Sequence, residues 1–301
     1  MTTTFAPRLK PRRASVKHKK AIAIFLAPFA ALFAAFYLLP IGWAIGQSLL
    51  VVERDGTFGK PVEVFGGLTQ YILVFQNEAF WASVGRVALF GVVQVPVMLG
   101  FALVLALLLD SPLVKGKKFF RLAFFVPYAV PGVIAAIMWG YLYSPNLSPF
   151  AAFTSGFDLL APETVLWSIA NVVTWVYVGY NMLIIYSALL ALPTEIFEAA
   201  RLDGANQLQI ALSIKIPLVM PAIVLTAIFS IIGTLQLLAE PQVFRSFTSS
   251  VSSTFTPNIA VYTTSAVPNV SLAAAMSVVL AIATFVMSFV FLKFTQRKGD
   301  Q

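Results

Sequence analysis

The chain has 301 residues, no cysteine and a single histidine. The absence of cysteine excludes disulfides and thiolate metal sites, and the redox compartment cannot be inferred from cysteine content. His18 lies in a basic N-terminal stretch, where we interpret it as a solvated residue and not as a ligand. The sequence therefore predicts no metal site and no catalytic residue.

Charged residues are also scarce. They make up 11% of the chain against 59% for hydrophobic residues, and the mean hydropathy is +0.88. The apolar residues fall in runs of about 20 or more, the length that crosses a hydrocarbon core about 30 Å thick. This pattern excludes a soluble protein.

The apolar runs predict an all-α membrane protein with six transmembrane helices. The first run has flanking charges like those of a signal peptide, but it is too long and lacks a clear cleavage site, so we interpret it as an uncleaved anchor. The expected organisation is a basic tail over 1–20, a six-helix domain over 21–294 and a short tail over 295–301. The six spans are expected at about 21–46, 86–109, 120–143, 165–192, 217–239 and 272–294.

The lysines and arginines are distributed unevenly between the two sides of such a bundle. Sixteen of the 20 lie in the N-terminal tail, 110–121, 193–216 and the C-terminus. Three lie in 51–80, 144–163 and 239–270. Because cytoplasmic loops hold the excess of positive charge, both termini are predicted to be cytoplasmic. The net charge of +8 then reflects the membrane topology. We therefore do not interpret it as a sign of nucleic-acid binding, and no nucleic acid is expected as a partner.

The chain lacks an energy source of its own. A Walker A loop needs glycine-rich backbone amides and a GK[ST] ending, whereas Lys118 follows Gly116-Lys117 and Pro61 follows Lys60. Paired acids within the spans, expected of many proton-coupled carriers, are missing as well. Energy for any transport must therefore come from a partner.

Against this background the stretch "EAARLDGANQLQIALSIKIPLVMP", residues 198–221, is unusual because four charged residues interrupt two apolar runs. Thr194 can cap a helix, and Glu195 and Glu198 suit the positive end of its dipole. Gly204 can adopt a left-handed conformation and end that helix. A second helical piece over about 206–214 would lead to Pro217 as the first residue of the fifth span.

These features predict a short helix across the cytoplasmic membrane face. Ala199 and Ala200 would let another protein approach it closely. The alternative from the pattern alone is an ordinary interfacial turn between two spans.

The same residues resemble the EAA signature of binding-protein-dependent ABC importer permeases. The resemblance is to the sugar-type class, which includes the maltose and glycerol-phosphate permeases, and it covers nearly the whole chain from the first span onward. Ala211 departs from the pattern, since the family often has a bulky aromatic residue there. The matching residues are Glu198-Ala199-Ala200, Asp203-Gly204-Ala205, Ile214, Ile216-Pro217 and Pro221, together with "FFVPYAVPGVIAAIMW" (124–139) and "AAAMSVVLAI" (273–282).

The resemblance implies the type I importer architecture in a prokaryotic plasma or inner membrane. It implies that the loop 193–216 docks in a cytoplasmic ATPase subunit through Glu198, Ala199, Ala200, Asp203 and Gly204. ATP and Mg would be held by that partner, and this chain would bind no cofactor. The other implied partners are a second permease subunit, a paralogue of this chain, an extracytoplasmic sugar-binding protein and the lipid bilayer.

Polar residues within the spans are candidates for the substrate pathway. Asn171, Thr174 and Asn181 fall within an arc of about 80° on span four, and Thr226, Ser230 and Thr234 share one face of span five. Helix packing is an equal alternative for each of them, because hydroxyls bond back to helix carbonyls and amides bridge helices. The candidate pathway residues are Tyr128, Gly132, Asn171, Tyr180, Asn181, Ser230 and Thr234.

Tyr128 and Gly132 enter this set through the third span. Pro127 and Pro131 should disturb that helix and free backbone carbonyls, and in sugar permeases the matching Pro-Tyr-x-x-Pro segment contributes to the substrate cavity. Trp175, Tyr177 and Tyr180 can stack on apolar sugar faces, although aromatic residues also fill helix interfaces.

The expected cargo is a neutral mono- or oligosaccharide, because the candidate residues are uncharged and no counter-charge is identified near the midplane. We interpret Glu240 and Arg245 as solvated loop charges, with the cavity border or a delivery protein as the alternatives. The alternative function is a self-contained secondary carrier or an integral-membrane enzyme. A carrier should show internal repeats or intramembrane ionisable residues, and an enzyme a cluster of acids or histidines, and neither is found.

Overall fold

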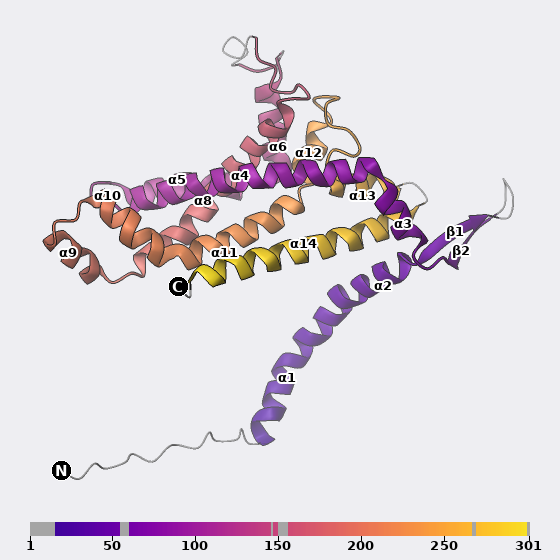
Figure 1. Ribbon diagram of the computed structural model, residues 1–301, viewed down its shortest axis with the longest axis horizontal. Coiled ribbons are helices and arrows are strands. Elements are labelled where there is room, and N and C mark those ends of the chain that lie inside the picture. Colours follow the sequence, from indigo (N-terminus) through magenta and orange to yellow (C-terminus); the bar gives the residue numbers. More distant parts are fainter. Residues whose placement is uncertain (1–15, 55–59, 146, 150–155, 267–268, 300–301) are drawn as a thin grey trace.

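The computed structural model describes residues 16–54, 60–145, 147–149, 156–266 and 269–299. They form an elongated helical bundle with one small hairpin at its end (Figure 1). The helical architecture is confirmed, and the hairpin is an element that the sequence did not predict. The tail at 1–15 and the last two residues lie outside the described part.

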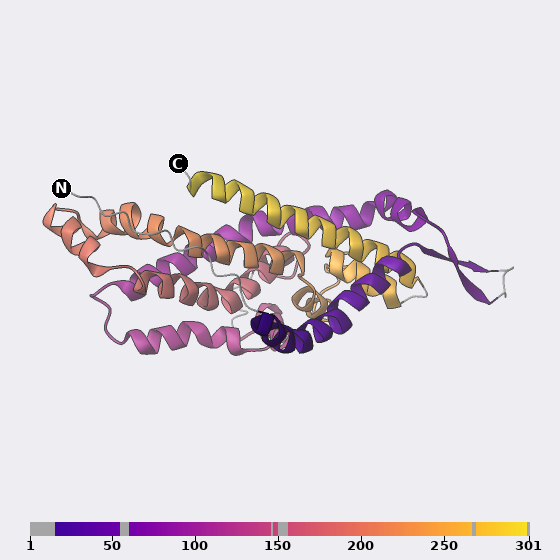
Figure 2. The ribbon, with the colours of Figure 1, turned by 90° about the horizontal axis from the view of Figure 1, so that it is seen from below.

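The first span is a continuous helical segment that lies mostly apart from the bundle. It comprises α1 (Val16–Phe33), the π-turn η1 (Ala34–Leu38) and α2 (Leu39–Gln47). Its apolar part, Ile22–Gln47, has a mean hydropathy of 2.4, yet 0% of its most apolar window is buried. α2 packs on α14 (Val270–Gly299), while α1 extends away from the bundle (Figure 1); seen from below, the segment lies in front of the other helices (Figure 2). The expected helix over 21–46 is confirmed.

The hairpin joins β1 (Leu50–Arg54) to β2 (Pro61–Phe65), with Leu50 opposite Phe65 and Arg54 opposite Pro61. Each strand holds two valines, and β-branched side chains favour extended backbone. α3 (Thr69–Gln76) follows and leads back to the bundle. Span counting treats this region as a loop, which is why the strands were missed.

α4 (Glu78–Asp110) begins eight residues earlier than the expected span over 86–109. Its N-cap, Asn77, accepts a hydrogen bond from the Phe80 backbone N–H at 3.0 Å. Arg86 does not mark a helix end, because it lies inside α4. Its guanidinium donates to the Phe255 carbonyl at 2.8 Å. With 33 residues the helix is about 50 Å long, so it extends beyond a hydrocarbon core.

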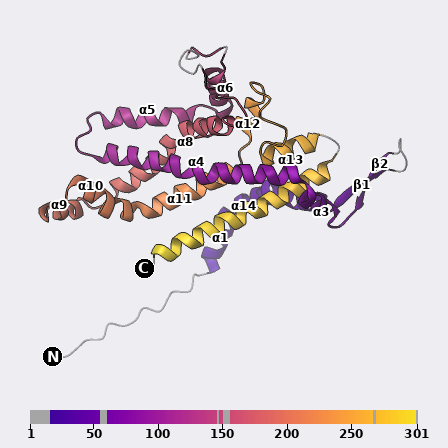
Figure 3. The same cartoon turned by 45° about the horizontal axis from the view of Figure 1, so that its top comes forward.

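The third span differs from the expected single helix over 120–143. α5 (Lys117–Ala129) and α6 (Gly132–Tyr143) meet at an angle of 94°. Pro131 cannot donate a backbone hydrogen bond, and the residue before it, Val130, is extended at φ −78° and ψ 124°. The predicted disturbance of this helix is thus confirmed, but it is a sharp break and not a kink. Figure 3 shows α5 along the bundle and α6 rising from it.

α8 (Val165–Leu190) packs against both α4 and α5 at the centre of the bundle (Figure 3). Its contact with α5 is so close that only glycine fits at position 179. A Cβ on Gly179 would lie 1.8 Å from the Phe124 carbonyl oxygen. The core around α8 is formed by buried aliphatic residues such as Ile169, Met182 and Ile185.

The remaining helices close the bundle around the break in span three. α11 (Ile216–Leu235) packs on α4, α8 and α14, and α12 (Ala239–Phe244) packs on α6. α13 (Pro257–Ala266) then leads to α14. Five helices are long and apolar enough to cross a membrane, or six if the bent pair α5–α6 is one span, within the described part of the chain.

Candidate functional site

A cavity of about 540 Å³ lies where the break between α5 and α6 faces α8, α11 and α12. Proline and glycine at the break, aromatic rings of α8 and small polar residues of α11 form its walls. The lining residues are Gln94, Met98, Pro131, Gly132, Val133, Val173, Tyr177, Tyr180, Asn181, Phe229, Ser230, Gly233, Thr234, Gln236, Leu237, Leu238, Ala239 and Glu240.

Most of the candidate pathway residues from the sequence meet at this cavity. Gly132, Tyr180, Asn181, Ser230 and Thr234 line it. Tyr128 lies beside it, because its ring stacks on Tyr180 with centroids 4.7 Å apart. It also meets Tyr177 edge-on at 5.8 Å, so three tyrosines form one aromatic cluster at the cavity.

Asn171 is the exception and must be placed elsewhere. Its amide donates to the Tyr143 hydroxyl at 2.6 Å, on the α6 side of α8. A helical wheel puts Asn171 and Asn181 on one arc but ignores the axial separation, which is about 15 Å for ten residues. Thr174, from the same arc, accepts a hydrogen bond from the Gln94 amide at 3.2 Å. Both residues bridge helices, the alternative that their pattern left open.

The cavity has hydrogen-bonding capacity that the protein itself does not use. Ser230 and Thr234 form no side-chain hydrogen bond with any described residue, whereas Thr226 donates to the Ile223 carbonyl at 2.8 Å. Asn181 is 2% exposed and donates to the Tyr177 carbonyl at 3.1 Å. Hydroxyl groups and aromatic faces side by side suit a solute with both polar and apolar surfaces.

Glu240 is not a solvated loop charge, and that interpretation was wrong. The residue is 7% exposed and lines the cavity from the start of α12. Arg245 is exposed, and its guanidinium donates to Gln242 at 3.4 Å. A sequence signal did exist, because three apolar residues and a proline flank Glu240, whereas solvated charges usually lie among polar residues.

Gln94 and Met98 on α4 also line the cavity and were missed. Gln94 is the one amide inside the long apolar run of α4, and an isolated polar residue in a span is itself a signal. Its Oε1 atom is buried without a hydrogen-bond partner.

The predicted coupling helix is present as α9 (Thr194–Leu202), between α8 and α11. Its N-cap is Pro193 and not Thr194, which forms no capping bond. Phe197 points inward and is 9% exposed. The candidate coupling residues Glu198, Ala199 and Asp203 are exposed, and Ala200 is half-buried.

The end of α9 has the turn that the sequence predicted. Gly204 adopts a left-handed conformation with φ +89°. Its N–H bonds to the Arg201 carbonyl at 3.0 Å, and the Ala205 N–H bonds to the Ala200 carbonyl at 2.9 Å. This is a Schellman motif, in which the last carbonyls of a helix are satisfied by the chain that leaves it.

A second helix starts immediately after this turn. Asn206 and Gln209 form a reciprocal capping box at the start of α10 (Gln207–Ile210). A π-turn, η2 (Ala211–Lys215), then joins α10 to α11 without a break. Pro217 lies in the first turn of α11, close to the expected start of the fifth span, but the helix continues backward through the π-turn. The wider π-turn ends at Lys215, two residues before Pro217, which has no N–H to continue an α-helical ladder.

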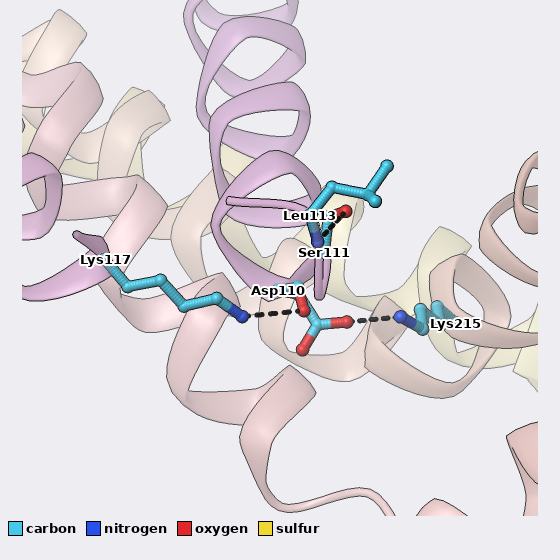
Figure 4. Close-up of polar contacts among 5 residues, drawn as sticks. All are labelled: Asp110, Ser111, Leu113, Lys117 and Lys215. Atoms are coloured by element: carbon cyan, nitrogen blue, oxygen red, sulfur yellow. Dashed lines mark hydrogen bonds and ion pairs between the residues drawn. The ribbon is translucent and has the colours of Figure 1, made fainter. Parts of the chain in front are cut away.

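One ion pair ties this region to the bundle. Lys215, in the π-turn, pairs with Asp110 at the end of α4 (Figure 4). Lys117, at the start of α5, donates to the Asp110 carbonyl at 3.1 Å. The Lys215 ammonium also lies 4.9 Å from the centre of the Phe197 ring on α9. A movement of α9 therefore acts on a residue that is bonded to α4.

The described parts of the basic segments 110–121 and 193–216 and of the C-terminus lie toward one end of the bundle, and the hairpin lies at the other (Figure 1). This placement agrees with the asymmetry of positive charge. Which end faces the cytoplasm stays a prediction.

Comparison with known proteins identifies the chain. The family model for the inner membrane component of binding-protein-dependent transport systems matches residues 98–298. The chain belongs to that family. The resemblance inferred from the EAA signature is thus confirmed, and with it a location in the membrane.

Relatives within the family carry different cargoes. The chain is 31% identical over 277 residues to the lactose transport system permease protein LacF of Rhizobium radiobacter, covering 88% of this chain and 91% of LacF. It is 27% identical to the diacetylchitobiose uptake system permease protein NgcF of Streptomyces coelicolor, covering 93% and 84%. It is 28% identical to the sn-glycerol-3-phosphate transport system permease protein UgpA of Yersinia pseudotuberculosis, covering 66% and 67%.

Solved structures show the same fold. A chain of a bacterial ABC transporter that imports the acidic polysaccharide alginate superposes with a TM-score of 0.78 at 18% identity, over 94% of this chain and 97% of that chain. A chain of the MetNI methionine ABC transporter gives 0.55 at 14% identity, over 76% and 98%. These importer structures confirm the architecture expected from the sequence.

Proposed function

We propose that this chain is the membrane-spanning permease subunit of an ATP-driven importer and forms half of the pathway for a mono- or oligosaccharide. The observation that carries the proposal is the 540 Å³ cavity at the α5–α6 break. It combines a tyrosine cluster with hydroxyls that have no partner in the described chain, which suits the apolar faces and hydroxyl groups of a sugar. The lactose and diacetylchitobiose permeases among its relatives support this class of cargo.

We further propose that α9 couples the cavity to a cytoplasmic ATPase. A small, polar surface is presented to a partner by Glu198, Ala199 and Asp203. The buried side chain of Phe197 holds α9 against the rest of the protein. Because α11 runs continuously from the loop to Ser230 and Thr234 at the cavity, a displacement of the loop is transmitted along one helix. In this proposal ATP and Mg stay on the partner, and this chain is not catalytic.

The remaining proposed partners are a second permease subunit, paralogous to this chain, and an extracytoplasmic sugar-binding protein. The apolar face of the first span leaves room for the former, because none of its most apolar window is buried within this chain. The second permease would supply the other half of the cavity wall, and the bilayer the rest of the surroundings.

Reconstitution tests the proposal. The chain would be co-expressed with its neighbouring permease, ATPase and binding-protein genes, and the purified complex placed in proteoliposomes. We expect ATP-dependent uptake of a neutral sugar from a panel of sugars, sugar phosphates and amino acids. ATPase stimulation by an amino acid alone would refute the sugar assignment. A stable chain that never co-purifies with an ATPase would refute the importer.

Truncating the tyrosine cluster tests the cavity. In Tyr128→Ala the ring that stacks on Tyr180 is lost, and we expect sugar uptake to fall about ten-fold because an aromatic contact is worth roughly 1 kcal/mol or more. The complex should stay assembled by size-exclusion chromatography. Tyr262→Ala, an exposed tyrosine on α13, is the matched control and should transport normally. Equal uptake by both variants would remove Tyr128 from the pathway.

A further inference from the structure

Glu240 is the one charged side chain among the described residues that line the cavity. It is 7% exposed. Its carboxylate forms neither an ion pair nor a hydrogen bond with the side chain of another described residue. Burying a charge without a partner is costly, so an unpaired acid near a membrane cavity calls for a functional reason.

The arginines at this end of the molecule do not compensate the carboxylate. Arg245 bonds to Gln242. Arg86 donates to the Phe255 carbonyl and lies over the Phe255 ring, 4.9 Å from its centre. Neither arginine forms an ion pair with Glu240, so the carboxylate is left to act on whatever occupies the cavity.

The break in span three explains how a carboxylate is tolerated here. A Cβ built on Gly132 would lie 3.2 Å from the Glu240 Oε1 atom, so the carboxylate approaches the backbone at the first residue of α6. The first N–H groups of a helix lack intrahelical acceptors, and the helix dipole is positive at that end. The positive end of this dipole offsets part of the cost of burying the carboxylate without pairing it with a cation.

A second acceptor among the lining residues has no partner. Gln94 Oε1 is buried and unbonded, and Gln94 lines the cavity from α4. Two acceptors, one of them charged, fit a solute that donates hydrogen bonds through hydroxyl or ammonium groups. A carboxylate or phosphate on the solute would instead meet the Glu240 charge in a site partly shielded from water, where repulsion is stronger than in bulk solvent.

We propose that Glu240 acts as a charge filter, so that the cavity admits neutral and cationic sugars and excludes anionic ones. This inference rests on the proposed import function and makes it narrower. It separates this chain from a glycerol-3-phosphate permease, a distinction that family membership does not make.

The absence of native cysteine allows a direct test. A single cysteine would be placed in the cavity by Ser230→Cys, and the assembled importer in nanodiscs would be treated with a cationic trimethylammonium and an anionic sulfonate methanethiosulfonate of similar size. We expect the cationic reagent to react faster. The ratio of the two rates should fall about ten-fold when Glu240→Gln removes the charge.

Two further variants control this result. Glu240→Asp keeps the charge and should keep the ratio within about two-fold. Ser253→Cys, exposed and outside the cavity lining, should give a ratio that Glu240→Gln does not change. An unchanged ratio at Ser230→Cys on loss of the Glu240 charge would overturn the filter. Because the reagents report charge without any sugar, this outcome is separate from a failure of neutral-sugar uptake, which would overturn the proposed function.

Discussion

At the scale of single residues, Gly179 fixes the distance between α5 and α8. The two backbones are so close that no side chain fits between them. The Tyr128–Tyr180 stack belongs to the same contact, because Tyr180 follows Gly179 on α8 and Tyr128 lies one turn after Phe124 on α5. The geometry of the aromatic cluster therefore depends on a residue that has no side chain.

Gly179→Ala should separate these helices. Its Cβ would meet a backbone carbonyl that cannot rotate away, and overpacking of this kind costs about 1–3 kcal/mol. We expect a lower midpoint of thermal unfolding and reduced sugar uptake. Gly100→Ala, on α4 with open space around it, is the matched control and should behave as the unmodified protein. A Gly179→Ala complex as stable as this control would show that the contact can relax.

Gly204→Val should damage coupling. The left-handed φ of +89° strains any β-branched residue, so the turn after α9 would change. We expect uptake to fall at least about ten-fold, while immunoblots of membranes show normal insertion. Gly67→Val carries comparable strain at the hairpin end, with φ +58°, and should keep most of the activity. Normal transport by Gly204→Val would show that the loop only connects two spans and does not couple them to an ATPase.

The sequence predicts the conformation or position of a residue well when its neighbours in the chain determine it, and poorly when distant residues do. The left-handed Gly204 follows from residues beside it, and it was predicted correctly. The places of Asn171 and Glu240 depend on Tyr143 and Gly132, which lie far from them in the chain: Asn171 follows the packing alternative, and the interpretation of Glu240 as a solvated charge was wrong. Among the five other candidates that line the cavity, Ser230 and Thr234 share one helix face and so share their neighbours, whereas Gly132 was expected from the resemblance to sugar permeases.

At the scale of elements, the prolines predicted a disturbance of span three but not its 94° angle, which brings α6 into contact with α12. Gly140 allows α6 to lie close to the segment that follows α12, since a Cβ there would lie 2.6 Å from the Phe247 ring. The hairpin and the early start of α4 were missed because hydropathy reports where a helix crosses the core and not where it ends.

The Asp110–Lys215 pair links two elements and can be tested by a double-mutant cycle. Both side chains are largely buried, at 11% and 15% exposed, so a single change leaves a buried charge at a cost of about 3–5 kcal/mol. We expect Lys215→Met and Asp110→Leu each to lower the unfolding midpoint and the sugar imported per ATP.

The double variant Lys215→Met/Asp110→Leu should regain the stability but not the coupling, because the link between the loop and α4 is still absent. Lys118→Met, an exposed change on the first turn of α5, serves as the control. Additive losses of stability in the double variant would show that the pair does not act as a unit.

At the scale of the whole molecule, the charge asymmetry predicts the orientation. Reporters that work only in the cytoplasm should be active after residue 301 and within 193–216. They should be silent within 51–80 and 239–270. Activity at 239–270 with silence at 193–216 would reverse the topology and remove α9 from the side where an ATPase binds.

The exposed first span has a consequence for how the protein is made. No residue in its most apolar window is buried, compared with 39% for α4, so this helix needs no later part of the chain to be stable in lipid. It can leave the translocon while the ribosome is still synthesising the bundle, and it then holds the nascent chain at the membrane. The helices that build the cavity can assemble beside it without displacing it, so the packing allows an order of biogenesis in which the anchor is inserted first and the bundle folds second.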